Sequence, residues 1–231
     1  MDEFRRIAAR ATTITFDCYG TLIDWAAGLN ASLARLFGKA DSAVDLSRRY
    51  VEVEAEVEAG GYRLYREVMQ ETALRMGRQL GRPSSAAQAA RFAAELPGWK
   101  PFADTNEALR LLKKRYRLGV LSNVDRELFA GTSKQFSVAF DFVITAEDVR
   151  SYKPVHGHFE RLLATQAKRE DVVHVAQSLY HDGRACRELG IAFVWINRYK
   201  DVRTGEAEVL AEFSDLLAFA REACGPGGPA D

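Results

Sequence analysis

The chain has 231 residues, of which 47% are hydrophobic and 28% are charged, and its 32 basic and 32 acidic side chains give a formal net charge of zero. These values are typical of a globular protein with one large domain, or with a core and an insert. They argue against a nucleic-acid partner, which needs clustered Lys and Arg, and against a membrane partner, because no apolar run approaches the roughly 18 residues of a span.

Two features of the sequence predict a cytoplasmic protein. Residues 1–11 are charged and lack the apolar segment of a signal peptide. The three cysteines, Cys18, Cys186 and Cys224, are far apart and form no C-x-x-C pair. Free thiols of this kind are typical of a reducing compartment.

The first predicted element is a buried strand over Thr13–Asp17, which ends on a carboxylate. A sharp turn should follow, because Gly20 and the small hydroxyl residue Thr21 come within four positions. An aspartate held at a strand end can act as a nucleophile. Cys18 is a second candidate, but neighbours on a strand point to opposite faces. We therefore expect Cys18 to point away from the group that Asp17 attacks.

A long helical insert is predicted after this turn. About 95 residues separate Asp17 from the next strand, far more than one crossover helix needs. The run Val51–Glu58 alternates like a strand, but its Glu and Ala content favours an exposed helix. We expect the insert to extend from Asp24 to about Leu96, over the edge of a sheet where α/β proteins bind ligands. Residues 97–101, Pro-Gly-Trp-Lys-Pro, mark the return of the chain to the core.

The rest of the chain alternates strands and helices, which predicts a doubly wound, parallel α/β sheet. The strands are expected at Arg117–Ser122, Phe142–Thr145, Val172–Ala176 and Ala192–Asn197. The helices are expected at Thr105–Arg115, Phe159–Ala167, Arg184–Leu189 with Gly190 as C-cap, and Asp215–Ala223 with Ser214 as N-cap. The predicted domains are a core of residues 1–23 and 97–224, a helical cap of residues 24–96, and a disordered tail of residues 225–231.

Polar residues follow four of the predicted strands. Asp17 ends the first strand and Ser122-Asn123 the second, while Lys153 follows the third and Asp182 the fourth. Each alone has an ordinary explanation as a turn residue, a helix cap or a solvated side chain. In a parallel sheet, however, these strand ends lie on one edge. The four signals can therefore converge on a single site.

This order of motifs, D-x-x-G-T, S-N, K-P and an acidic loop, resembles the haloacid dehalogenase superfamily of hydrolases. The resemblance covers most of the chain, and the helical insert is similar to the family's cap domain. It implies that Asp17 forms an ester intermediate and that Thr21 fixes the loop. The expected anion donors are the backbone N–H groups of Cys18 and Tyr19 and the side chains of Ser122 and Asn123. Lys153 would keep the nucleophile ionised, and Asp182 would activate water.

Two positions bear on whether the electrophile is carbon or phosphorus. Phosphatases of the superfamily carry a proton-donating aspartate where this chain has Tyr19, and a phenol with a pKa of about 10 is a poor substitute. Halide needs no proton to leave, and the sequence D-x-Y-G-T resembles the L-2-haloacid dehalogenases. Phosphatases also place a magnesium-binding aspartate where this chain has Ser178. Both positions favour metal-free chemistry on carbon.

The chain departs from the dehalogenase pattern at three places. Gln177-Ser178-Leu179 replaces the sequence S-S-N before the last aspartate, and Phe159 replaces a tyrosine. The halide-binding arginine of the cap corresponds by spacing to Arg48 or Arg49, although both could also lie on a solvated helix face. Ser178 is expected to contact the substrate.

The preferred function is hydrolytic dehalogenation of a small, anionic (S)-2-haloacid without a cofactor. The alternatives are a Mg²⁺-dependent phosphatase, a hydrolase that attacks carbon in another small carboxylate, and a binding module without activity. His181 could line the site, and Trp25 could line a small apolar pocket. A homodimer is possible, because cap helices often form dimer surfaces in similar proteins.

Overall fold

The computed structural model describes residues 1–38, 45–203, 205 and 207–225. The predicted disordered tail lies outside the described residues from position 226 onward. Six parallel strands form one sheet in the order β3-β2-β1-β4-β5-β6, which confirms the predicted α/β class. The strands are β1 (Thr13–Phe16), β2 (Arg117–Ser122), β3 (Phe142–Thr145), β4 (Val172–Ala176), β5 (Ala192–Ile196) and β6 (Ala211–Phe213). The sequence did not predict β6, because this three-residue edge strand is not fully buried and lacks an apolar run.

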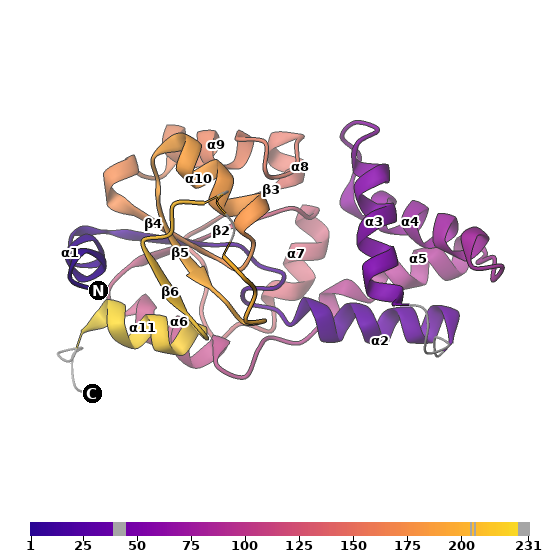
Figure 1. Cartoon of the computed structure of the whole chain (residues 1–231), viewed down its shortest axis with the longest axis horizontal. Coiled ribbons are helices and arrows are strands. Elements are labelled where there is room, and N and C mark those ends of the chain that lie inside the picture. The colour runs from indigo at the N-terminus through magenta and orange to yellow at the C-terminus, as the bar shows by residue number, and fades with distance from the viewer. Residues whose placement is uncertain (39–44, 204, 206, 226–231) are drawn as a thin grey trace.

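Helices cover both faces of this sheet (Figure 1). One face carries α1 (Asp2–Arg10), α6 (Thr105–Lys113) and α11 (Leu216–Cys224). The other carries α8 (Ala146–Val149), α9 (Gly157–Thr165) and α10 (Arg184–Leu189). The prediction of Ser214 as the N-cap of α11 is wrong, because Asp215 accepts the capping hydrogen bond from the N–H of Ala218 at 2.7 Å. Gly190 ends α10 with a φ of 66°, as the sequence predicted.

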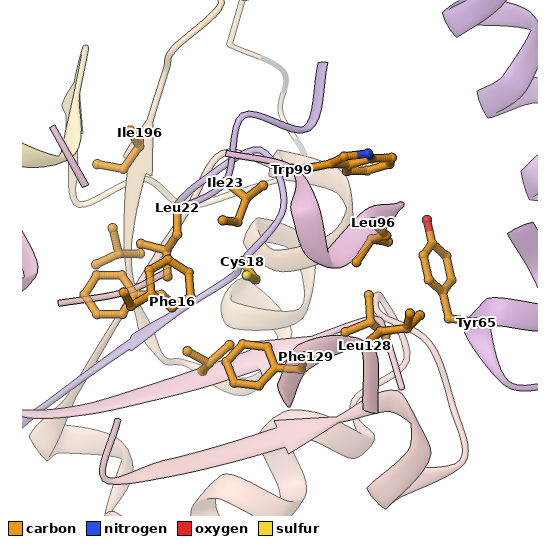
Figure 2. Close-up of a cluster of buried hydrophobic side chains, with 14 of the residues drawn as sticks. Phe16, Cys18, Leu22, Ile23, Tyr65, Leu96, Trp99, Leu128, Phe129 and Ile196 are labelled. Carbon is orange, nitrogen blue, oxygen red and sulfur yellow. The ribbon is translucent and has the colours of Figure 1, made fainter. Parts of the chain in front are cut away.

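Alternate residues of the buried strands contribute to two separate apolar layers. Phe16 of β1 packs in the layer under α1, α6 and α11, and Cys18 continues on the same side (Figure 2). Phe193 of β5 packs in the opposite layer. Since neighbours along a strand alternate, Asp17 is directed away from the layer that buries Cys18. Burial raises the pKa of the Cys18 thiol well above its usual value, so this residue is a packing side chain.

The segment between β1 and β2 is helical, as predicted, and lies beside the sheet (Figure 1). Its helices are α2 (Trp25–Phe37), α3 (Leu46–Glu58), α4 (Tyr65–Gln79) and α5 (Ala86–Ala94), followed by the short turn η1 (Leu96–Gly98). Asp24 caps α2, and Ser85 with Gln88 forms a capping box on α5. η1 packs on α7 (Arg126–Ser133) and links the helices to the core.

The run Val51–Glu58 is helical in the structure, which agrees with the prediction, but one of its faces is not exposed. Val53 and Val57 are buried in the apolar core, and Glu54 and Glu58 are half-buried. No helix in the described parts of the chain is long and apolar enough to cross a membrane.

Candidate active site

The candidate site lies where the strand order of the sheet reverses. Phe16 at the end of β1 pairs with Val120 of β2 and with Val175 of β4, so the carboxyl ends of the three strands lie together. From β1 the chain continues to one side through β2 and β3, and later to the other side through β4 and β5. In open α/β sheets, the crevice outside such a reversal is the usual ligand-binding position.

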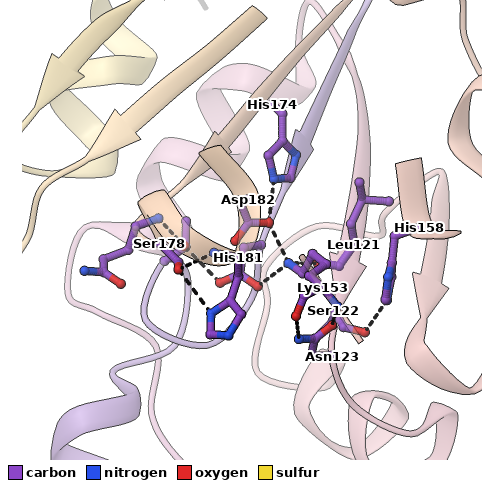
Figure 3. A network of polar contacts seen from close by, with 12 residues as sticks. Leu121, Ser122, Asn123, Lys153, His158, His174, Ser178, His181 and Asp182 are labelled. Atoms are coloured by element: carbon purple, nitrogen blue, oxygen red, sulfur yellow. Dashed lines mark hydrogen bonds and ion pairs between the residues drawn. The ribbon is translucent and has the colours of Figure 1, made fainter. Parts of the chain in front are cut away.

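The structure brings Asp17, Lys153 and Asp182 into direct contact at this position. The ammonium of Lys153 lies 2.8 Å from Asp17 Oδ1 and 2.6 Å from Asp182 Oδ1. It also donates to the carbonyl of Leu121 at 2.8 Å (Figure 3). All three hydrogens of the ammonium therefore have an acceptor, which fixes its position between the two carboxylates.

Burial makes this charge cluster strongly interdependent. The side chains of Lys153 and Asp182 are each 1% exposed, and that of Asp17 is 13% exposed. Burial raises the pKa of Asp17, and the positive charge of Lys153 opposes that rise. Burial alone would also raise the pKa of Asp182, but the ammonium and a histidine outweigh it and hold the pKa below its usual value. The two carboxylates raise the pKa of Lys153 despite its burial.

His174 is a site residue that the sequence reasoning missed. Its Nε2 lies 2.9 Å from Asp182 Oδ1, and its Nδ1 lies 2.8 Å from the hydroxyl of Thr15. A tautomer with the proton on Nε2 donates to Asp182 and accepts from Thr15. The signal in the sequence was a single polar residue in the middle of the buried run Val172–Ala176, which needs a polar partner.

The turn after β1 is held by hydrogen bonds from distant segments. Thr21 donates to Asp17 Oδ2 at 3.2 Å and accepts from the N–H of Gln177 at 2.9 Å. Arg198, also missed by the sequence reasoning, donates to the Thr21 carbonyl at 2.9 and 3.1 Å. Gly20 adopts a φ of 97°, which favours glycine. Within the described residues the N–H groups of Cys18 and the next residue make no hydrogen bond.

The hydroxyl of Tyr19 is not directed at Asp17. It lies 2.8 Å from the hydroxyl of Thr132 on α7, and its ring packs edge-on against Trp99. Burial raises the pKa of this phenol well above its usual value. Tyr19 therefore has neither the position nor the acidity to protonate a leaving group.

The Ser122-Asn123 pair lies at the end of β2 but interacts differently from the expectation. The hydroxyl of Ser122 is buried and has no hydrogen-bond partner among the described residues. The Asn123 amide donates to the Lys153 carbonyl at 3.2 Å and accepts from the Lys153 N–H at 2.7 Å. Asn123 therefore positions the lysine, and the structure does not place Ser122 at the pocket wall.

A pocket of about 380 Å³ opens beside Asp17. Six residues expected to form the site line it: Asp17, Tyr19, Asn123, Lys153, Ser178 and Asp182. Trp25 and His181, for which a site position was only one alternative, line it as well. Ser178 bonds to His181 through its hydroxyl, with 3.1 Å to Nδ1 and 3.0 Å to the backbone N–H. The cap contributes Val51, Glu54, Glu58 and Tyr65.

The arginines proposed for halide binding lie elsewhere. The side chain of Arg48 is 79% exposed and pairs with Glu52, one turn further along α3, at 3.3 Å. Arg49 donates to Gln79 of α4 at 3.0 Å and approaches Glu52. α3 presents Val51, Glu54 and Glu58 to the pocket instead. The expectation that Arg48 contacts the substrate is therefore not met by this arrangement.

No group of three or more His, Cys, Asp or Glu side chains that could hold a metal ion is found in the described part of the chain. Asp182 directs its Oδ1 atom to Lys153 and His174.

Comparison with known proteins identifies the family. Residues 11–190 match the haloacid dehalogenase-like hydrolases, and the chain belongs to this family. It is 28% identical to haloacetate dehalogenase H-2 of Moraxella sp. (strain B) over 80% of this chain and 85% of that protein. It is 31% identical to an (S)-2-haloacid dehalogenase of Pseudomonas putida, over 42% of this chain and 44% of the relative.

A solved structure shares the fold. The L-2-haloacid dehalogenase from Xanthobacter autotrophicus with chloropropionic acid covalently bound superposes with a TM-score of 0.82 at 16% identity. The match covers 94% of this chain and 100% of that chain. The arrangement of sheet and insert is therefore that of the family.

Proposed function

We propose that the protein hydrolyses the carbon–halogen bond of a small (S)-2-haloacid through an ester on Asp17. The observation that carries this proposal is the turn after β1, where Asp17 contacts Lys153 while the Tyr19 hydroxyl bonds to Thr132. A phosphoester needs a proton donor for its leaving alcohol, whereas a halide leaves without one. The Moraxella and Pseudomonas relatives, named for haloacetate and (S)-2-haloacids, support the same chemistry.

In the first step a carboxylate oxygen of Asp17 attacks the carbon that bears the halogen. The new C–O bond forms as the carbon–halogen bond breaks, and the halide leaves with the bonding electrons. Lys153 stabilises the ionised form of Asp17 against burial. The N–H groups of Cys18 and Tyr19, which make no hydrogen bond among the described residues, suit the substrate carboxylate.

In the second step water attacks the carbonyl carbon of the ester. Asp182 Oδ2 is buried and has no partner in the described residues, so it is available to accept a proton from that water. The other oxygen of Asp182 is held by Lys153 and His174. The bond between the carbonyl carbon and the alcohol oxygen then breaks, and the proton held by Asp182 passes to that oxygen. The product therefore takes its alcohol oxygen from Asp17, and the oxygen of water remains on the regenerated carboxylate.

The proposal extends to the setting of the reaction. Residues 24–96 would act as a cap domain on a core formed by residues 1–23 and 97–224, and Thr21 would hold the nucleophile loop. Ser178 would line the substrate pocket. The reaction would proceed in the cytoplasm without a cofactor.

A test measures chloride release from (S)- and (R)-2-chloropropionate, with EDTA and with Mg²⁺, and phosphate release from p-nitrophenyl phosphate. We expect the (S) enantiomer to react in EDTA and Asp17→Asn to be inactive, while Asp141→Asn at the surface serves as the matched control. A single turnover in ¹⁸O-labelled water should label Asp17 and leave the product unlabelled. Phosphate release that requires Mg²⁺, without chloride release, would contradict the proposal.

A further inference from the structure

The cap side of the substrate pocket is acidic. Glu54 and Glu58, one turn apart on α3, line the same pocket as Asp17 and Asp182. Among the described residues that line this pocket, Lys153 is the only lysine or arginine, and both core carboxylates already bind it. A bare carboxylate substrate would therefore find no cation on the cap side.

The two cap glutamates have no counter-ion in the protein. Neither of them forms an ion pair with any residue that the structure describes. Glu54 accepts a hydrogen bond from the hydroxyl of Tyr65 at 2.7 Å, and this neutral donor is its polar contact. By contrast, Glu52 on the exposed side of the same helix pairs with Arg48 and Arg49. The glutamates of α3 that have no ion-pair partner among the described residues are therefore the two that line the pocket.

The surroundings show how strongly a cation would be favoured. Burial raises the pKa of Glu54 to about 7, and burial together with the charge of Glu54 raises the pKa of Glu58 to about 8. A bound ammonium would lower both pKa values by supplying a positive charge beside the carboxyl groups. Tyr65 and Trp25 line the same wall, and aromatic faces also attract organic cations.

The core end of the pocket holds an acceptor and two donors that have no partner among the described residues. The Asp182 Oδ2 atom is buried and unpartnered within the described chain, and Asp182 borders the pocket. The N–H groups of Cys18 and Tyr19 make no hydrogen bond among the described residues and suit an anion. The pocket therefore has an anion-binding turn at the sheet edge and, in the cap, two carboxyl groups without a counter-ion among the described residues.

We propose that Glu54 and Glu58 bind a cationic group of the substrate, so that the preferred substrate is a small carboxylate that also carries an ammonium group. The carboxylate would bind at the turn after β1 and the ammonium between the two glutamates. This inference names the substrate class for the reaction proposed above. It rests on that reaction only where chloride release is measured, because ligand binding can be measured without turnover.

The first test is a binding measurement that needs no turnover. Calorimetric titration compares 4-(trimethylammonio)butyrate with 5,5-dimethylhexanoate, which has the same shape without the positive charge. We expect the wild type to bind the cationic ligand at least about tenfold more tightly, as one well-placed charge pair provides. The double variant Glu54→Gln/Glu58→Gln should lose this preference, and Glu56→Gln on the exposed side of α3 should retain it.

Three results would overturn the inference: equal binding of the two ligands, binding of neither, or a preference that survives in the double variant. The alternative role for the two glutamates is as protonated hydrogen-bond donors to an anion. In that case the glutamine side chains of the double variant would still donate, and the wild type would prefer 5,5-dimethylhexanoate. Circular dichroism of each variant shows whether the fold is retained. The single variants repeat the measurement if the double variant does not fold.

The second test separates this inference from the proposed reaction. Chloride release is compared between 2-chloro-4-(trimethylammonio)butyrate, which cannot cyclise, and 2-chloro-5,5-dimethylhexanoate. A kcat/KM ratio that favours the cationic substrate and disappears in the double variant supports both proposals. A binding preference without chloride release from any haloacid supports the cation site and contradicts dehalogenation. Chloride release without a preference contradicts the cation site alone.

Discussion

Replacement of Lys153 by Met tests whether the buried ammonium keeps the nucleophile ionised. The substitution retains an unbranched apolar side chain and removes the charge between two carboxylates that lie 2.8 and 2.6 Å away. At 2.8 Å and an effective dielectric constant of about 20, the attraction that Asp17 loses is about 6 kcal/mol before changes in solvation. Loss of one partner from a buried pair typically destabilises a protein by about 3–5 kcal/mol.

Two measurements follow from these magnitudes. The thermal midpoint of Lys153→Met should lie about 10 °C or more below that of the wild type. This difference in thermal midpoint should become smaller as the pH falls. The difference decreases because protonation at low pH neutralises the carboxylates that have lost their counter-ion. The acidic limb of the chloride-release profile should move to higher pH, since the pKa of Asp17 rises further when the opposing charge is removed.

The exposed Lys168→Met provides the matched control and should change neither quantity. The reasoning is refuted if folded Lys153→Met keeps the wild-type pH profile, or if its activity is low and independent of pH. In the second case the lysine would have a role other than stabilising the ionised nucleophile.

Three further outcomes can be measured. Arg48→Ala should leave kcat and KM for 2-chloropropionate within about twofold, as for most surface changes, and a tenfold higher KM would place this arginine at the halide. Arg198→Met removes two hydrogen bonds to the Thr21 carbonyl, at 2.9 and 3.1 Å, and a two-point contact with Asp104. The free energy of unfolding should fall by about 2–4 kcal/mol, and an unchanged denaturant midpoint would refute this. Glu58→Gln should gain stability relative to the wild type as the pH rises from about 5 to about 8, because the unfolded wild type loses this proton while the folded protein, with a pKa of about 8, retains it. A pH-independent difference in thermal midpoint would contradict this.

The sequence predicted the class of fold and the side of the sheet that carries chemistry. Five apolar runs correspond to strands β1 to β5, because strands buried on both faces need near-continuous apolar residues. Asp17, Lys153 and Asp182 could be expected to converge because the carboxyl ends of parallel strands share one edge. The presence of a tyrosine at position 19, where phosphatases of the superfamily carry an aspartate, also distinguished this chain from the phosphatase pattern on sequence alone.

Other parts of the site depend on contacts between distant segments and could not be read from local patterns. Sequence spacing alone could not show that His174 holds Asp182, or that Arg198 holds the Thr21 carbonyl. The orientation of α3 is a further case. Its Val53 and Val57 are buried in the core, and this packing turns Glu54 and Glu58 toward the pocket.

The sequence by itself thus determined strands β1 to β5 and the convergence of Asp17, Lys153 and Asp182, because periodicity and strand ends are local properties that parallel topology converts into proximity. Only the tertiary structure decided that Arg48 faces solvent while the cap presents two glutamates to the ligand. The rotation of a helix about its axis is set by packing against elements far away in the chain, and it decides which side chains of α3 reach the pocket wall.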